Sequence, residues 1–544
     1  MSILVFTLLL AMAAGHAGAQ TWAFAERAGG SGNDYGDHVA VDAAGNSYAI
    51  GEFQGSAQFD TVTLAGPGIW KLFLAKYNPA GRIVWATVVA YTTGTGSDIY
   101  GSAIVLDAAG NIYIGGRFVA GVTFAGDTLR TSRGPTDMLL VKVNNAGGVV
   151  WARTPGGAAT GSYGEDGISS IGLDSGGNPY ITGYYNKDAE FDTIALASTL
   201  AYEAFVAKYD SAGHALWARS GGGIGALHLG LGIAVDGGGN CIVSGKFFNT
   251  LSFGGFTFDA GDAEQKAFIA KFDRDGTVLW AKEIGSGGYY GAGEDIAADA
   301  EGNVYVCGQF RSTISFGTTE HTFSNGLSYA ALIVKYDGGG NYLWSMQSTG
   351  ADQAVHLAGI CVDRDGSIFA AGSFSGTMDL GSAHLSSPAP NNSAFAVHMN
   401  AQGTTITAAQ ISGNASASAG DVAPSGNGSC TIIGIFTDTI GIGPFRLGSA
   451  GANDIMLARL ESAGASVKQP EPSGSEVPAL YPNPAAEFVH LQDAGTAERV
   501  QIFSARGMLV RESVYTGSID LRGLPAGLYL IRAGGRSMKL IKTD

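Results

Sequence analysis

The sequence is poor in charged residues and in long apolar runs, and each shortage excludes a class of protein. Asp, Glu, Lys and Arg make up only 14% of the 544 residues, and the net charge is −16. Nucleic acid phosphates need many Lys and Arg partners, so nucleic acid is excluded as a ligand. After the first residues no stretch stays apolar for about 18 residues, so no transmembrane helix is expected.

Glycine is abundant instead, with 84 residues, while proline contributes only 15. The apolar content of 45% is enough for a sizeable core, and the aromatic content of 10% favours β-strands over helices. The composition therefore predicts an all-β protein rather than a disordered or helical one.

The N-terminus has the pattern of a secretory signal. Ile3–Ala14 is apolar but too short to span a bilayer, and Ala17-Gly18-Ala19 offers a small-residue cleavage site. We expect residues 1–19 to be a signal peptide that directs the chain to the periplasm. A buried N-terminal strand is the alternative.

Cysteine is scarce, and the four residues lie in strand-like segments of different repeats. Buried cysteine behaves as a small apolar residue, so we expect free buried thiols, with disulfides as the alternative in an exported chain. No Cys-x-x-Cys pair is present and the nine His residues are scattered, so neither a metal site nor a cofactor is expected. The cysteines are Cys241, Cys307, Cys361 and Cys430.

One pattern recurs seven times between residues 20 and 467. An apolar triplet precedes Asp, two small residues and Gly-Asn, and the following apolar run ends in Gly-x-Phe, as in residues 39–53. In the seventh copy Ala423 replaces the Asp and Gly426-Asn427 is kept. We expect the Asp to accept backbone N–H groups within its turn, with calcium binding as the alternative. The aromatic endings are Phe53, Phe118, Tyr185, Phe247, Phe310, Phe374 and Phe436.

Each repeat continues with a Lys-Tyr strand, a Gly-containing turn and a Trp strand, as in residues 205–217. Four short strands per repeat favour a β-propeller, which leaves few exposed sheet edges. The seventh repeat lacks its Trp strand, whereas Trp22–Arg27 is an unassigned Trp strand at the N-terminus. We therefore predict one seven-bladed β-propeller over residues 20–467, closed by the N-terminal strand.

These motifs resemble the SBBP repeats of bacterial β-propellers, whose signature combines Asp-x-x-Gly-Asn with Gly-x-Phe. The resemblance covers about residues 22–464. It implies the fold and carries no defined activity.

A polar, Pro-rich linker is expected at residues 468–479, before a second domain at residues 480–544. Short alternating segments in this second domain predict a small Ig-like β-sandwich. The domain resembles the type A C-terminal sorting domain of the type IX secretion system of Bacteroidota. The motif residues that carry this resemblance are Pro482, Asn483, Pro484, Gly527, Tyr529, Lys539 and Lys542.

The resemblance implies that the secretion machinery is a partner and that the protein crosses the outer membrane. It further implies removal of the domain, for which Gln469–Pro478 is the expected region, followed by release or attachment to surface lipopolysaccharide. Within the motif we expect the prolines to fix an extended entry and Gly527 to make a tight turn.

Familiar catalytic motifs are absent from the sequence. In a propeller, the loops between the last strand of one repeat and the first strand of the next reach the central channel. Their mixture of aromatic and acidic residues suits a polysaccharide or protein ligand, while turn and packing roles are the alternative. The candidate residues are Asp34, Tyr35, Asp98, Tyr100, Asp166, His228, Glu294 and Asp295.

We therefore expect a secreted or cell-surface, non-catalytic binding module for polysaccharide or protein. Propellers also host enzymes, so a secreted polysaccharide lyase or hydrolase with its active site in the channel is one alternative. A purely structural surface component is the other.

Overall fold

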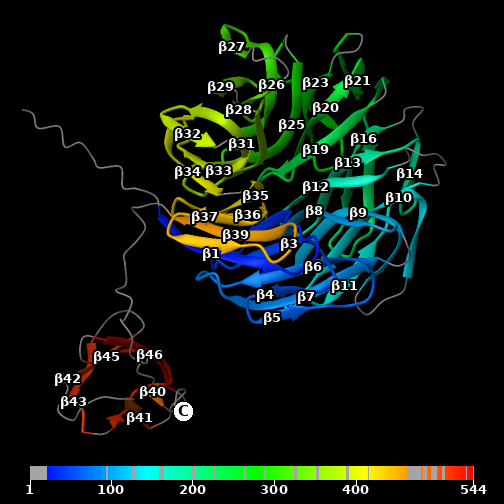
Figure 1. The fold of residues 1–544 in the computed structure, drawn as a ribbon. Coiled ribbons are helices and arrows are strands. Elements are labelled where there is room, and N and C mark those ends of the chain that lie inside the picture. Colours follow the sequence, from blue (N-terminus) through cyan, green and yellow to red (C-terminus); the bar gives the residue numbers. More distant parts are fainter. Residues whose placement is uncertain are drawn as a thin grey trace, which may run out of the picture. The chain divides into compact units, whose positions relative to one another are not determined.

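The computed structural model contains two compact units, residues 1–466 and residues 467–544, and every described element is a β-strand (Figure 1). The all-β prediction is therefore confirmed. The expected signal peptide, the region Gln469–Pro478 and Pro482 to Pro484 lie outside the described residues. The structure describes residues 21–92, 96–124, 129–157, 165–197, 202–225, 227–261, 265–286, 289–323, 328–350, 354–387, 391–413, 416–461, 480–481, 487–491, 499–504, 509–516, 518–533 and 536–542.

The first unit consists of seven sets of four antiparallel strands, one for each sequence repeat. Neighbouring first strands contact one another around a closed circuit, and in Figure 1 several of them lie toward the middle of the unit. The first strands are β2 (His38–Val41), β8 (Ile99–Leu106), β12 (Gly167–Leu173), β19 (His228–Val235), β25 (Tyr289–Ala298), β30 (Ala354–Val362) and β35 (Ala417–Gly426). The second strands are β3 (Ser47–Gln54), β9 (Ile112–Phe124), β13 (Pro179–Tyr185), β20 (Cys241–Phe248), β26 (Val304–Phe316), β31 (Ile368–Leu380) and β36 (Ser429–Phe436).

The third and fourth strands complete each set. The third strands are β6 (Trp70–Tyr77), β10 (Leu129–Val143), β16 (Glu203–Tyr209), β23 (Gln265–Phe272), β28 (Ala330–Tyr336), β33 (Ser393–Met399) and β39 (Asp454–Glu461). The fourth strands are β7 (Ile83–Thr92), β11 (Val149–Arg153), β17 (Ala215–Ser220), β24 (Val278–Glu283), β29 (Tyr342–Thr349), β34 (Thr405–Gly413) and, for the last set, β1 (Thr21–Gly29). The strand β1 pairs with β39 from Thr21 opposite Glu461 to Ala28 opposite Ile455, so the two ends of this unit share one sheet.

The second and third strands are apolar almost throughout rather than alternating, because both faces of each sheet are covered by neighbouring sets. All seven residues of β16 and of β33 are buried. The core is accordingly divided into clusters between adjacent sets. One cluster, for example, joins Met138 and Leu140 of the second set to Ile171, Ile181 and Phe205 of the third.

The Trp residues of the fourth strands join adjacent sets. In four sets the Trp Nε1 donates a hydrogen bond of 3.0–3.2 Å to a carbonyl in the next set's turn. In the last set this place belongs to Phe24, which pairs with Arg459 as Trp217 pairs with Lys208. Trp22 instead pairs with Leu460, so the Trp strand was correctly located but the wrong residue was matched to the repeat.

Each repeat contains a hairpin that the four-strand prediction missed, between its second and third strands. In four sets the hairpin pairs with the end of the preceding set's fourth strand, as β4 pairs with β1, and thereby links neighbouring sheets. The separate hairpin strands are β4 (Ala57–Phe59), β5 (Val62–Leu64), β14 (Asp188–Phe191), β15 (Ile194–Ala197), β21 (Thr250–Phe253), β22 (Phe256–Asp259), β27 (Thr319–Phe323), β32 (Ala383–Ser387), β37 (Thr439–Ile442) and β38 (Phe445–Gly448), and β21 pairs with β18 (Gly222–Ile224).

The repeat Asp residues cap their turns as predicted. Asp42 accepts the backbone N–H groups of Ala44 and Asn46, both at 2.9 Å. In the seventh set, however, the matching place is taken by Ser425 rather than by Ala423, because Ala423 pairs within the ladder with Thr431. There Asn427 and Gly428, with φ of 55° and 70°, form a two-residue hairpin turn in place of the Asp turn.

The four cysteines are buried and free, as predicted. Each contributes a small apolar side chain to its strand, and burial raises the pKa of the Cys307 and Cys361 thiols well above the usual value. They are therefore packing residues of the core rather than cross-links.

The second unit has two sheets, one of β40 (Leu480–Tyr481), β41 (Phe488–Leu491) and β44 (Ile519–Asp520), and one of β43 (Leu509–Val514), β42 (Arg499–Ser504), β45 (Gly527–Ala533) and β46 (Arg536–Lys542). Both sheets contribute to one apolar core, as a small sandwich requires. The tight turn was assigned to the wrong glycine. Gly527 is the first, nearly extended residue of β45, whereas Gly523, with φ of 83°, lies in the turn before it. Tyr529 is buried, and its hydroxyl donates to the carbonyl of Pro525 at 2.8 Å.

The first strand contains a β-bulge in six of the seven sets, and only β2 pairs with its second strand without a shift in register. In β8 the pairing with β9 shifts between Gly101 and Ala103, so that Ser102 is the extra residue. The bulge moves the Tyr100 carbonyl to the place where a side chain at Gly116 would begin. Only glycine, which has no Cβ, fits beside this carbonyl. In five other sets a Cβ on the corresponding glycine would likewise overlap a backbone carbonyl.

Replacing Gly116 by Ala tests this relation. The added Cβ forces the Tyr100 carbonyl out of the bulge, and we expect a loss of about 1–3 kcal/mol in the free energy of unfolding. Gly255→Ala is the matched control, because a Cβ at Gly255 meets no atom within 4 Å. Urea unfolding of both variants is the measurement, and equal stabilities would contradict the explanation.

The junction between the last and first sets buries two facing carboxylates, Asp34 and Asp454. Asp34 accepts the Gly30 N–H at 2.6 Å, and Arg27 Nε lies 2.9 Å from Asp454. Burial raises the pKa of Asp34 to about 6, and the neighbouring charge of Asp454 adds to the rise. Between pH 4 and pH 6, folded Asp34 therefore holds a proton that the unfolded chain has lost, and raising the pH lowers stability.

Asp34→Asn keeps the shape of this side chain and removes its titration. We expect the stability of the variant relative to the unmodified protein to rise between about pH 4 and pH 6 and to stay level above about pH 7. Urea unfolding at four pH values measures this difference, with exposed Asp275→Asn as the control. A difference that is constant across the pH range would refute the assignment.

Candidate functional site

The bulges bring residues from several sets to one place. The bulge residues Ser102, Ser169, Leu231 and Glu294 come from four different sets, yet they line a single pocket of about 320 Å³. A residue outside the strand ladder no longer has to alternate with its neighbours, so each bulge turns one side chain toward its counterparts in the other sets. The remaining lining residues are His38, Tyr100, Arg117, Ile168 and Tyr184.

Arg117 is the central polar residue of this pocket. It is the middle residue of a Gly-x-Phe motif, and its Nη1 lies 2.8 Å from both Glu165 Oε2 and the Tyr184 hydroxyl. Its guanidinium also lies over the Tyr100 ring, 4.7 Å from the centroid. These contacts hold the guanidinium plane in one orientation at the pocket wall.

Aromatic rings continue on both sides of Arg117. Tyr35 packs against Trp70 and Tyr184 packs against Tyr202, each pair with ring centroids 5.9 Å apart. Tyr100 is 37% exposed and the other four rings are half-buried, so their faces and edges are only partly covered. Partly exposed rings beside polar groups are the surfaces on which sugars and peptides pack.

Carboxyl groups surround the pocket behind its lining. Burial raises the pKa of Glu52 well above the usual value, and the adjacent Asp37 carboxyl raises it further. Two adjacent buried carboxyls cannot both ionise at low cost, so burial beside Asp37 favours the protonated form of Glu52. Burial and the charge of Asp421 together raise the pKa of Asp295 to about 7.

His38 stands between these acids and the pocket. Its Nδ1 lies 3.4 Å from Asp421 Oδ2, which also accepts the Val39 N–H at 3.0 Å. Burial disfavours the imidazolium, but the hydrogen bond and charge of Asp421 outweigh burial and raise the pKa of His38. The pocket wall therefore carries the basic groups His38 and Arg117, and the Glu52 carboxyl, whose protonated form is favoured by burial, lies behind that wall.

Four of the predicted site residues lie at or beside this pocket. Tyr100 and Glu294 line it, and Glu294 accepts a hydrogen bond of 3.3 Å from Gln309. Tyr35 belongs to the adjoining aromatic row, and Asp295 lies behind the lining, where it accepts the Ile360 N–H at 2.9 Å.

The other predicted residues have structural roles. Asp34 belongs to the closing junction, and buried Asp166 accepts the N–H groups of Gly157 and Asn186. His228 is fully buried between Glu203 and the Phe248 carbonyl. The backbone carbonyl of Asp98 accepts the Val119 N–H at 2.8 Å, so Asp98 lies at the end of the pairing between β8 and β9.

Sequence reasoning missed His38, Arg117, Tyr184 and Glu165. Arg117 and Tyr184 occupy the variable position of Gly-x-Phe, where the other sets carry Glu52, Lys246, Gln309, Ser373 and Ile435. The middle position of Gly-x-Phe carries a different type of side chain in nearly every repeat, and this variation could have indicated a functional position.

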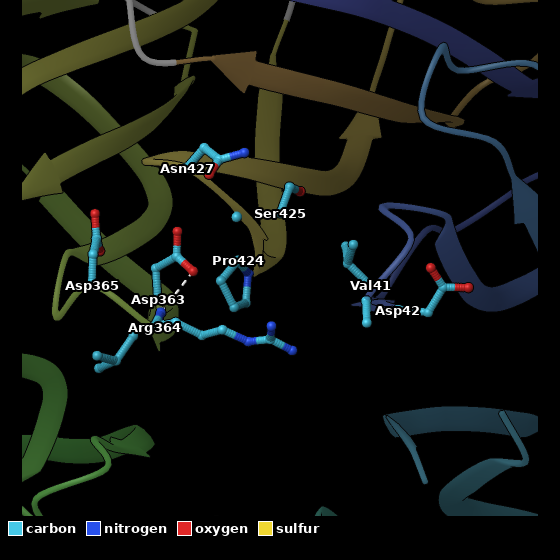
Figure 2. Close-up of a pocket in the computed structure, with 11 residues that line it drawn as sticks. Val41, Asp42, Asp363, Arg364, Asp365, Pro424, Ser425 and Asn427 are labelled. Carbon is cyan, nitrogen blue, oxygen red and sulfur yellow. Dashed lines mark hydrogen bonds between the residues drawn. The ribbon is translucent and has the colours of Figure 1, made fainter. Parts of the chain in front are cut away.

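A second pocket, of about 580 Å³, lies where turns of the first, sixth and seventh sets meet (Figure 2). Its carboxylates are occupied by the turns themselves. Asp363 accepts the Arg364 and Gly428 N–H groups, and Asp365 accepts the Ser367 N–H. This pocket is therefore built from turn-capping groups and is the weaker candidate.

Among the residues that the structure describes, no group of three or more His, Cys, Asp or Glu side chains is placed to hold a metal ion. No helix in that part of the chain is long and apolar enough to cross a membrane.

Comparison with known proteins gives one relative for the repeats. The chain is 26% identical over 424 residues to an uncharacterised WD repeat-containing protein, L264, of Acanthamoeba polyphaga mimivirus. The alignment covers 63% of this chain and 29% of that protein, so the chain matches less than a third of its relative.

Solved structures show only remote likeness. An ulvan lyase of polysaccharide lyase family PL25 is 11% identical, with a TM-score of 0.40, over 79% of this chain and 95% of that one. PorZ, a surface component of the type IX secretion system of Porphyromonas gingivalis, is 12% identical, with a TM-score of 0.25, over 94% and 81% of the two chains. At these scores the likenesses indicate neither ligand nor activity.

The C-terminal match is specific. Residues 479–543 match the secretion system C-terminal sorting domain family. The protein is therefore exported by the type IX secretion system and is secreted or attached at the cell surface, and its distant relative is a WD repeat-containing protein.

Proposed function

We propose that residues 21–461 form a seven-bladed β-propeller of the SBBP type that binds polysaccharide without converting it. The closed circuit of first strands and the pairing of β1 with β39 support seven blades. Export to the cell surface places such a module among extracellular polysaccharides.

The observation that carries this proposal is the aromatic row beside the pocket. Trp70, Tyr35, Tyr100, Tyr184 and Tyr202 come from three neighbouring sets, and Arg117 connects the third and fourth of these rings. Sugar rings pack their C–H faces on aromatic side chains while their hydroxyls bond to nearby polar groups. The lining residues Ser102, Ser169 and Glu294 supply those polar groups.

A glycan array with the full-length protein tests the proposal. Tyr100→Ala should weaken binding about tenfold, because the ring both contacts the ligand and supports Arg117. Phe256→Ala is the matched control, since Phe256 is equally exposed at 37% but lies on β22, outside the pocket. Equal binding by the two variants would contradict the site, and capture of proteins alone would contradict the ligand class.

A lyase or hydrolase is the second candidate, and one observation favours it. Burial beside Asp37 raises the pKa of Glu52 and so favours the protonated carboxyl, which is the form that a general acid requires. Product analysis of each bound polysaccharide separates the two functions. Shortened chains that disappear with Glu52→Gln would identify the protein as an enzyme.

A further inference from the structure

Basic side chains outnumber acidic ones in the pocket lining, although the protein as a whole carries a net charge of −16. Two of the nine lining residues, His38 and Arg117, are basic, and Glu294 is the one acidic residue among them. The carboxyls of Asp37, Glu52, Asp295 and Asp421 are not part of the lining, so a ligand in the pocket meets the guanidinium of Arg117 and the imidazole of His38 before it meets these acids.

Two of the three side-chain nitrogen atoms of Arg117 can still donate hydrogen bonds to a ligand. Only its Nη1 is engaged, by Glu165 and Tyr184, and its Nη2 and Nε have no partner among the described residues. A guanidinium presents two parallel N–H groups along one edge, which matches the two oxygens of a carboxylate. Tyr100 beneath the guanidinium and Tyr184 at its end keep that edge in a fixed direction.

The contact with Glu165 indicates that Arg117 can bind a carboxylate. Its side chain is 48% exposed, and its carboxylate lies 2.8 Å from Nη1. Ion pairs at such exposed positions contribute little to stability, so this contact can be exchanged at little cost. Glu165 therefore leaves the Nη2 and Nε edge open, while its negative charge beside Nη1 opposes a second carboxylate at that edge.

We propose that the pocket recognises a uronic acid residue of an acidic polysaccharide, whose carboxylate binds Arg117 in competition with Glu165. Arg117 is then the specificity-determining residue, and the aromatic row carries the neighbouring sugars. This inference rests on the proposed polysaccharide-binding function and adds the class of sugar to it.

Titration of the full-length protein with short oligouronates, measured by calorimetry, tests the inference. The comparison ligands are the same oligosaccharides with their carboxylates reduced to alcohols, and sulfated neutral oligosaccharides. The unmodified protein should bind the uronate about tenfold more tightly than the reduced form. Arg117→Gln should abolish that preference while still binding the reduced form.

Two further variants separate recognition from folding. Arg117→Lys keeps the charge without the paired donors, so it should weaken uronate binding about tenfold and sulfate binding less. Glu165→Gln removes the competing carboxylate and should tighten uronate binding about threefold, a gain that damage to the fold cannot produce. Arg219→Gln, on the fourth strand β17, is the control and should leave every affinity unchanged.

The outcomes distinguish the inference from the proposed function. Equal binding of uronate and reduced ligand, unchanged by Arg117→Gln, would refute the uronate and leave polysaccharide binding in place. A preference for sulfate that Arg117→Lys retains would assign the site to sulfated sugars instead. Loss of all glycan binding, with or without carboxylates, would refute both proposals.

Discussion

The close contact between a backbone carbonyl at the bulge and the glycine of Gly-x-Phe determines which side chains line the pocket. Six of the seven first strands contain a bulge, and in six sets a backbone carbonyl lies where a Cβ on the glycine of Gly-x-Phe would begin. The bulge residue is then free of the alternation that governs the rest of the strand. Ser102, Ser169, Leu231 and Glu294 line one pocket for this reason, although up to 192 residues separate them in the chain.

Such a pocket depends on the whole ring. Its lining comes from the first five sets, and no set could form it alone. The sets are held in place by the Trp contacts to neighbouring turns and by hairpins that pair with the preceding fourth strand. The last and first sets are joined in the same way through β1, with Phe24 in the place of Trp and β4 paired to β1. The geometry of the site is therefore a property of the closed scaffold, not of mobile loops.

Much of this architecture could be predicted because the repeat makes each local signal appear seven times. The turn-capping role of Asp42 and the strand at residues 22–27 followed from that regularity. The hairpins were missed because their turns differ chemically, from Asp60-Thr61 to Gly443-Pro444. The convergence of His38, Arg117 and Tyr184 could not be predicted, because it depends on how far each bulge turns a side chain. The partners of acidic loop residues such as Asp166 could not be predicted either, because backbone N–H groups compete for carboxylates as effectively as ligands do.

Hydrogen exchange measured by mass spectrometry, with and without a bound acidic oligosaccharide, tests the location of the site most directly. Binding at the pocket should protect the backbone amides of β8, β9, β12 and β13, whose residues line it. The turns at residues 362–365 and 424–427, which line the second pocket, should exchange as before. Protection confined to those turns, with none in β8 to β13, would contradict the account.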